Sequence, residues 1–465
     1  MENFWDYSAW GFIMIISLLL GSLLAGNTLK RKIPFLKNSL MPASVIGGTV
    51  LILLAAVYKG VTGNVMFDTA VFNHNGTAYL EMITYHTLAL GFVASTLKIT
   101  NSHLNRKRTV EIVNSGVTTV ATYLLQGIVG LGITIIAAII MSGFFEAAGM
   151  LLPFGFGQGT GQAMNYGNIY EQDYGFDGGK SFGLTIAALG FLSASFGGVI
   201  HLNVMKKQGK LKISEDAKRL NVETVEGSDE IPMQESLDKT SIQIAFIFIS
   251  YALAYIMMYV LGKLLPGMKS TIYGFNFLLG VLCATIVKYI TRFLRKKQFM
   301  HREYINNFLL TRLSNFFFDV MIVSGIAAIR LDILEKYWGI AIIIAFGGLI
   351  ATYAYNRFVA KVLFKEYVEE QFLAMYGMLT GTASTGIILL REVDGNFKTP
   401  AADNLVYQNF PAILLGFPML ILATLAPKNT IVALAIIFAY FVVLNIVLFR
   451  SVIFKKRGAK NKTKE

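Results

Sequence analysis

Two short polar stretches interrupt an otherwise very hydrophobic chain, and the first, residues 157–167, reads GQGTGQAMNYG. Glycines such as Gly159 and Gly161 permit unusual φ values and a close approach of the backbone to a ligand. Four side chains of the stretch can both donate and accept hydrogen bonds: Gln158, Thr160, Gln162 and Asn165. The stretch therefore predicts a substrate-binding segment in which protein groups replace the water around a small solute.

The second polar stretch lies within residues 371–391, which read QFLAMYGMLTGTASTGIILLR. Its centre supplies five further candidate substrate-binding residues: Gly381, Thr382, Ala383, Ser384 and Thr385. Hydroxyl oxygens suit a hard cation such as sodium, so Thr382 and Ser384, together with Thr160 of the first stretch, are also candidate ion ligands. We expect no catalytic residue, no organic cofactor and no metal other than sodium.

Two charged residues extend this candidate site. Arg391 ends the second stretch, where its guanidinium could bind a substrate carboxylate in a bidentate manner; the alternative is an arginine that reaches the membrane rim. Asp319 lies deep inside the apolar run NFFFDVMIVSG, where an ionisable group is a functional candidate by default. Asp319 is therefore a candidate ion-binding or proton-accepting residue, and the alternative is a hydrogen bond that packs helices.

The composition places these stretches in a membrane. Of the 465 residues, 54% are hydrophobic and 15% are charged, and the mean hydropathy is +0.56. In soluble domains, by comparison, about a quarter of the residues are charged. The net charge of +13 does not indicate nucleic acid, because the basic residues come in short bursts between apolar runs.

The apolar runs predict an all-α integral membrane protein with about eleven transmembrane helices. We expect them near 8–29, 41–58, 79–97, 117–142, 181–205, 241–262, 271–291, 313–330, 337–356, 405–426 and 431–450. If the N-terminus lies outside, all but seven of the 41 Lys and Arg fall on the inner side. That asymmetry predicts an outside N-terminus and a cytoplasmic C-terminus in a plasma membrane.

Segments 150–171 and 372–391 do not fit as full crossings, because each must begin and end on the same side. We expect two re-entrant hairpins that enter from opposite faces. The order of elements predicts an inverted repeat, with halves at 1–205 and 241–426, a cytoplasmic connector at 206–240, and an extra span with a basic tail at 427–465. Inverted repeats with broken helices at the midplane are typical of secondary transporters that work by alternating access.

Other functions have less support. Glycine-rich turns also allow tight helix packing without binding anything. A passive channel would leave the inverted halves unexplained. A membrane-embedded enzyme lacks a motif, since the sequence has neither a HExxH zinc pair nor a GxSxG elbow.

Three stretches resemble the bacterial glutamate:sodium symporter family. MPASVIGGTVLIL (41–53) is similar to that family's second helix, and GQGTGQ followed by YEQDYGF (170–176) is similar to its first hairpin and the turn after it. LSN (313–315) leading to GIAAIRLDIL (325–334) is similar to the third helix of its second half. The resemblance in the order of elements runs over about 1–426.

The resemblance implies a secondary transporter of a bacterial inner membrane, with a homodimeric assembly. It implies that one domain carries an acidic amino acid, with glutamate first, inward together with sodium against a fixed dimerisation scaffold. This chain departs from the family pattern at Gln158, where histidine is common, and at Asp319, where a small hydroxyl residue is usual. The alternative is a proton-coupled carrier, or an exporter, of another small organic anion or amino acid.

Overall fold

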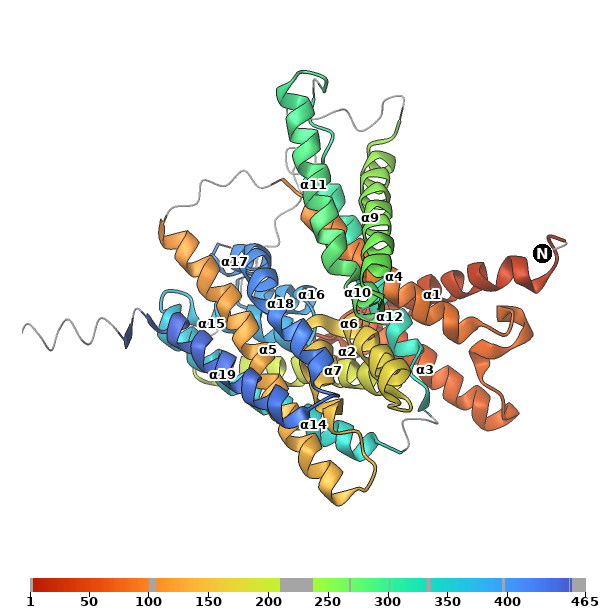
Figure 1. Ribbon diagram of the computed structural model, residues 1–465, viewed down its shortest axis with the longest axis horizontal. Coiled ribbons are helices and arrows are strands. Elements are labelled where there is room, and N and C mark those ends of the chain that lie inside the picture. The colour runs from red at the N-terminus through yellow and green to blue at the C-terminus, as the bar shows by residue number, and fades with distance from the viewer. Residues whose placement is uncertain are drawn as a thin grey trace, which may run out of the picture.

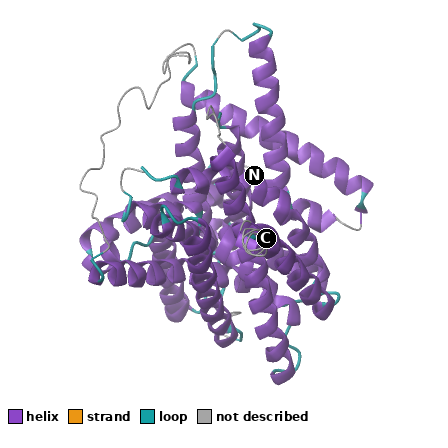
Figure 2. Ribbon diagram, turned by 90° about the vertical axis from the view of Figure 1, so that its left-hand side faces the viewer, coloured by secondary structure: helices purple, strands orange, loops and turns teal. Residues whose placement is uncertain are grey.

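The structure is a computed structural model that describes residues 3–99, 106–209, 237–266, 269–300, 302–331, 336–394, 398–450 and 452–453. Within these ranges the chain forms helices and loops and no strand, as Figure 2 shows. The prediction of an all-α membrane fold is confirmed.

The helices follow one another along the whole chain. Those before the connector are α1 (Tyr7–Lys32), α2 (Pro34–Asn38), α3 (Ala43–Thr62), α4 (Gly76–Leu97), α5 (Arg106–Ile140), α6 (Leu151–Tyr174) and α7 (Gly179–Lys207), with short 3₁₀ turns η1 (Met66–Asp68), η2 (Ala70–Phe72) and η3 (Glu146–Met150). Those after it are α9 (Lys239–Leu264), α10 (Lys269–Gly274), α11 (Asn276–Lys296), α12 (Asn307–Ala327), α14 (Trp338–Leu363), α15 (Val368–Thr380), α16 (Ala383–Arg391), α17 (Ala401–Tyr407), α18 (Asn409–Leu425) and α19 (Thr430–Leu448).

Nine helices of the described part are long and apolar enough to cross a membrane: α1, α3, α5, α7, α9, α11, α12, α14 and α19. The predicted span 405–426 is not one straight helix, because α17 and residues 411–425 of α18 form a pair bent by 50°. The predicted span 79–97 corresponds to α4, whose polar side chains pack inside the protein. Its Thr84 hydroxyl lies 2.9 Å from the Ser324 hydroxyl of α12.

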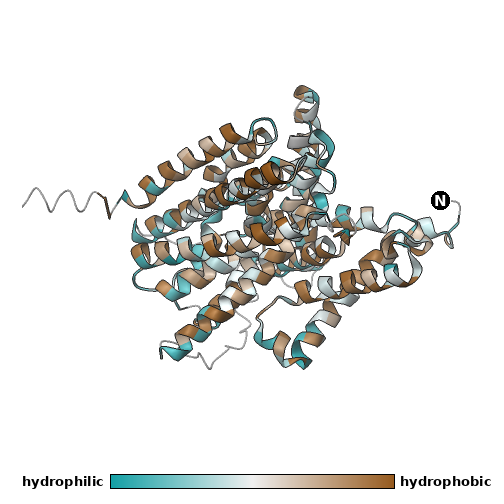
Figure 3. Ribbon diagram, turned by 90° about the horizontal axis from the view of Figure 1, so that it is seen from below, coloured by the Kyte–Doolittle hydropathy of each residue, from teal (hydrophilic) through white to brown (hydrophobic). Residues whose placement is uncertain are grey.

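The outer surfaces of the helices are apolar. Large side chains such as Ile139, Val61 and Leu414 are 80%, 82% and 76% exposed. Figure 3 shows long hydrophobic stretches along the helices, with polar residues gathered mainly at their ends. Such a surface would aggregate in water and is stable when lipid covers it.

The helices pack as two bodies built from separate parts of the chain (Figure 1). In the first, which we name the six-helix body, α1, α3 and α4 pack with α9, α11 and α12. In the second, the hairpin body, α5, α6 and α7 pack with α14, α15, α16, α18 and α19. The two bodies meet where α4 and α12 contact α6.

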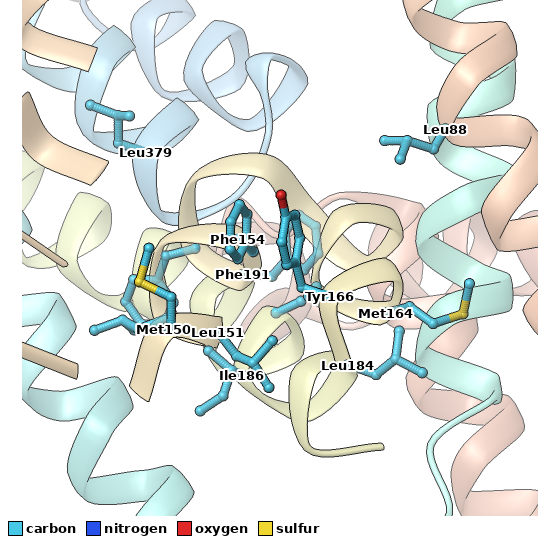
Figure 4. Packing of buried hydrophobic residues seen from close by; sticks show 14 of the residues in the cluster. Leu88, Met150, Leu151, Phe154, Met164, Tyr166, Leu184, Ile186, Phe191 and Leu379 are labelled. Carbon is cyan, nitrogen blue, oxygen red and sulfur yellow. The ribbon is translucent and has the colours of Figure 1, made fainter. Parts of the chain in front are cut away.

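The first predicted hairpin is α6, which folds back on itself at Gly159. The backbone of Gly159 has φ 79° and ψ −173°, and the residues on both sides of it are helical. The Phe154 and Tyr166 rings stack with centroids 4.0 Å apart (Figure 4). In a straight helix twelve residues would separate them by about 18 Å, so the two arms of α6 run side by side.

The second predicted hairpin consists of α15 and α16. The arms cross at two glycines: a β-carbon on Gly377 would lie 2.8 Å from Cα of Gly386, and one on Gly386 would lie 2.4 Å from the Ala374 carbonyl oxygen. No side chain fits between backbones this close. Both predicted hairpins are therefore present, and each has its break at a glycine-threonine pair.

Candidate functional site

The tips of the two hairpins meet in the middle of the protein. A β-carbon added to Gly159 would lie 3.5 Å from Cγ2 of Thr382 and 3.4 Å from Cε of Met321 in α12. The structure therefore brings together the two polar stretches that the sequence singles out. It places them where the hairpin body touches the six-helix body.

A cavity of about 150 Å³ lies beside the tips and between the two bodies. Its wall on the hairpin body includes polar side chains and the tip backbone: Thr119, Tyr123, Gln158, Gly381, Thr382, Ala383 and Asn409. Its wall on the six-helix body is mainly aromatic: Phe92, Phe277 and Phe318, with Met321, Leu278 and Ser95. Among the residues that the structure describes, none that lines this cavity carries a charge.

Helix ends, rather than charged side chains, create the electrostatic field at the two tips. The second arm of α6 begins at Thr160, directly after the break, and α16 begins at Ala383. Each N-terminus has free N–H groups and the positive end of a helix dipole. The first arm of α6 and α15 end at the same tips, so free carbonyl groups are close by; one of them, the Gly157 oxygen, accepts a hydrogen bond from Tyr123 Oη at 3.1 Å.

Several predicted residues of the first tip face the protein interior. Thr160 is fully buried and its hydroxyl donates to the Met321 carbonyl oxygen at 3.1 Å. A β-carbon on Gly161 would lie 2.8 Å from Cβ of Leu88, so this arm packs closely on α4. The Asn165 amide nitrogen donates to Gln162 Oε1 at 3.2 Å. Thr160 and Gly161 therefore pack the arm against α12 and α4, whereas Gln158 lines the cavity.

The second tip divides in a similar way. Gly381, Thr382 and Ala383 line the cavity, and the Thr382 hydroxyl lies 3.4 Å from the buried Thr385 hydroxyl. The side chain of Ser384 lies outside the described part of the structure.

The two charged candidates are not brought to the tips. Asp319 lies on α12 next to Ser44 of α3, and it does not line the cavity. Arg391 is exposed at the far end of α16, about 12 Å along the helix from Ala383 at 1.5 Å per residue. Their positions correspond to the packing and rim alternatives that the sequence leaves open.

The residues that α4, α5, α11, α12 and α18 contribute to the cavity were not predicted from the sequence. Tyr123 and Thr119 interrupt the apolar run of α5, and polar groups at membrane depth are a usable signal. Phe92, Phe277 and Phe318 give no comparable signal in the sequence, because aromatic residues are common in any membrane-spanning helix. Phe92 is 5.2 Å from Phe277 and 5.4 Å from Phe318 between ring centroids, so the three form one surface.

A second cavity of about 490 Å³ lies beside the second arm of α6. Its walls are formed by α4, α10, this arm and the start of α7. An ion pair bridges the two bodies there: Lys180 Nζ of α7 lies 2.8 Å from Glu81 Oε2 of α4. Lys180 Nζ is also 3.9 Å from Glu171 Oε1, which belongs to the same body as the lysine.

Comparison with known proteins identifies the family to which this chain belongs. No curated protein matches the chain significantly. A sequence model of a family described as "Sodium/glutamate symporter" matches residues 9–397. The match includes both hairpins and ends before α17. Because it covers most of the chain, the protein belongs to the sodium/glutamate symporter family.

Proposed function

We propose that this chain imports L-glutamate together with sodium ions by alternating access. Membership of the family makes it a multi-pass, sodium-coupled membrane transporter. The single observation that carries the finer proposal is the convergence of two half-helix N-termini on one cavity between two bodies.

A dicarboxylate suits a cavity of this kind. Free N–H groups and the positive ends of two helix dipoles favour anions. Since the described lining residues are all uncharged, these helix ends and neutral donors such as Gln158, Thr382 and Tyr123 would bind the carboxylates. Asp319 and Arg391 are left outside this proposed substrate site.

The two walls suggest how the substrate moves. Most of the polar side chains belong to the hairpin body, whereas the opposite wall is mainly aromatic and has Ser95 as its polar side chain. If the hairpin body slides along this surface, the substrate keeps its hydrogen bonds throughout the movement. The inverted order of elements in 1–205 and 241–426 gives two related states, each open to one side.

The remaining features follow from the same proposal. The distribution of basic residues favours an outside N-terminus and a cytoplasmic C-terminus. Ser95 and Thr119 line the cavity and lie in the halves of α4 and α5 that are nearest to Lys98 and Arg106, so we assign this conformation to an inward-facing state. We further propose that the six-helix body forms the homodimer interface in a bacterial inner membrane.

The test is a set of three variants assayed for glutamate uptake in proteoliposomes. Thr382→Val and Gln158→Leu remove one cavity-facing hydrogen-bonding group each, and each is expected to raise the half-saturating glutamate concentration about tenfold. Arg391→Gln is the control and is expected to leave it unchanged. Normal uptake by both cavity variants would refute the placement of the substrate at the tips.

A further inference from the structure

Two buried amide side chains on the neighbouring helices α5 and α14 of the hairpin body have an oxygen without a hydrogen-bond donor. Gln126 of α5 and Asn356 of α14 are 0% and 1% exposed. Neither Gln126 Oε1 nor Asn356 Oδ1 has a partner among the residues that the structure describes. A buried polar atom of this kind is costly unless something satisfies it.

The orientation of both amides is fixed by backbone carbonyl groups. Gln126 Nε2 donates to the Leu379 carbonyl oxygen and to the Thr352 hydroxyl, both at 2.8 Å. Asn356 Nδ2 donates to the Thr352 carbonyl oxygen at 2.9 Å. Turning either amide over would set its oxygen against a carbonyl oxygen. The unpartnered atoms are therefore acceptors rather than donors.

The two amides belong to one cluster. Asn356 Nδ2 also reaches the Thr122 hydroxyl at 3.3 Å, and that hydroxyl donates its own proton to the Thr118 carbonyl oxygen at 2.7 Å. Thr122 and Gln126 lie one turn apart on α5, as Thr352 and Asn356 do on α14. Four oxygen-bearing side chains thus face one another across two packed helices.

The cluster also adjoins the negative end of a half-helix. Leu379, which accepts from Gln126, is the penultimate residue of α15, and that helix ends at the tip of the second hairpin. The C-terminal end of a helix favours a cation. Broken membrane helices use such ends, with nearby oxygens, to coordinate sodium.

We propose that Gln126 Oε1 and Asn356 Oδ1, with the Thr122 and Thr352 hydroxyls, form a sodium site between α5, α14 and the end of α15. The inference rests on the proposed sodium-coupled transport and names where one ion binds. Because Leu379 is three residues from Thr382, an ion at this site stabilises the tip that lines the substrate cavity. This links sodium binding to glutamate binding.

The experiment measures ²²Na⁺ binding to the purified full-length protein without glutamate. Gln126→Leu and Asn356→Leu each remove one unpartnered oxygen and are expected to weaken sodium binding at least tenfold. Asn356→Asp keeps an oxygen at this position and adds a negative charge, so it is expected to retain binding. Thermal unfolding with and without sodium gives a second readout, because a ligand of the folded state raises the unfolding temperature.

Gln371→Leu is the matched control. Gln371 is also a buried amide of the hairpin body, 2% exposed, but both of its ends are partnered: Nε2 donates to the Ser115 hydroxyl at 3.1 Å, and Oε1 accepts from Asn404 at 3.0 Å. This variant is expected to bind sodium as the wild type does.

Each other result overturns the proposal in a recognisable way. Unchanged sodium binding in both Gln126→Leu and Asn356→Leu would mean that water, not sodium, satisfies the two oxygens, and sodium-coupled transport would stand. Equal loss in Gln371→Leu would mean that any buried amide matters and that no site is located here. No sodium binding by the wild type would reject both the site and the coupling ion.

Discussion

The ion pair between Lys180 and Glu81 joins the two bodies, so it should bias the equilibrium between the two transport states. In alternating access the hairpin body moves relative to α4, and the 2.8 Å pair has to separate. Lys180 keeps Glu171 as a second partner at 3.9 Å within its own body, which reduces the cost of separation. Replacing Lys180 by methionine removes the link between the bodies.

The size of the effect follows from the exposure of the pair. Both side chains are 23% exposed, so solvent screens the interaction in part. Pairs of this kind stabilise a structure by up to about 1 kcal/mol, which corresponds to about a fivefold change in the ratio of two states. Lys180→Met is therefore expected to increase the outward-open population up to about fivefold.

Maleimide labelling of a single cysteine measures this population. Met164 lines the second cavity and is 4% exposed, so Met164→Cys becomes reactive when the bodies separate. The only native cysteine, Cys283, is 2% exposed and is replaced by alanine. Lys180→Met should label faster, by up to about fivefold, than the parent protein.

Glu171→Gln is the control for this experiment, because it removes a negative charge beside the same lysine but within one body. It is expected not to accelerate labelling, because the pair between Lys180 and Glu81 stays intact. Equal rates in Lys180→Met and the parent protein would refute the reasoning. Equal acceleration by Glu171→Gln would show that the local charge, not the link between bodies, sets the rate.

Three further predictions concern single side chains. Gly159→Ala places a side chain at φ 79°, a strained conformation that costs about 1–3 kcal/mol. The unfolding temperature should therefore fall by about 1–3 °C, whereas Gly132→Ala on open helix surface should change it little. Thr160→Val removes the hydrogen bond to the Met321 carbonyl oxygen, so this conformation should lose about 1 kcal/mol and the Met164→Cys reporter should label faster. Asp319→Asn should leave the sodium dependence of uptake within twofold of the wild type, because the carboxylate lies beside Ser44 and away from the tips; a larger shift would return Asp319 to the ion path.

The hairpins could be predicted from the sequence because their physical signal is local. A stretch that is dense in glycine, amide and hydroxyl residues within an apolar run favours a broken helix, as around Gly159 and Thr382. The bend between α17 and α18 was missed, since the apolar run at 405–426 gives the same hydropathy whether the helix is straight or broken.

The rest of the site depends on packing between segments that are distant in the sequence, and local sequence patterns do not predict such contacts. Asp319 has the chemistry of an ion ligand, yet the rotation of α12 turns it toward α3 and turns Met321 toward the tips. Gln126 and Asn356 are unremarkable in their own helices and form a cluster only because α5 packs on α14.

Sodium-coupled glutamate transport is tested most directly by uptake of radiolabelled L-glutamate into proteoliposomes under an inward sodium gradient, compared with an inward potassium gradient. We expect accumulation that requires sodium and that is reduced at low glutamate concentrations in Thr382→Val. Accumulation of equal size with potassium, or driven only by a proton gradient, would contradict sodium-coupled glutamate transport by this protein.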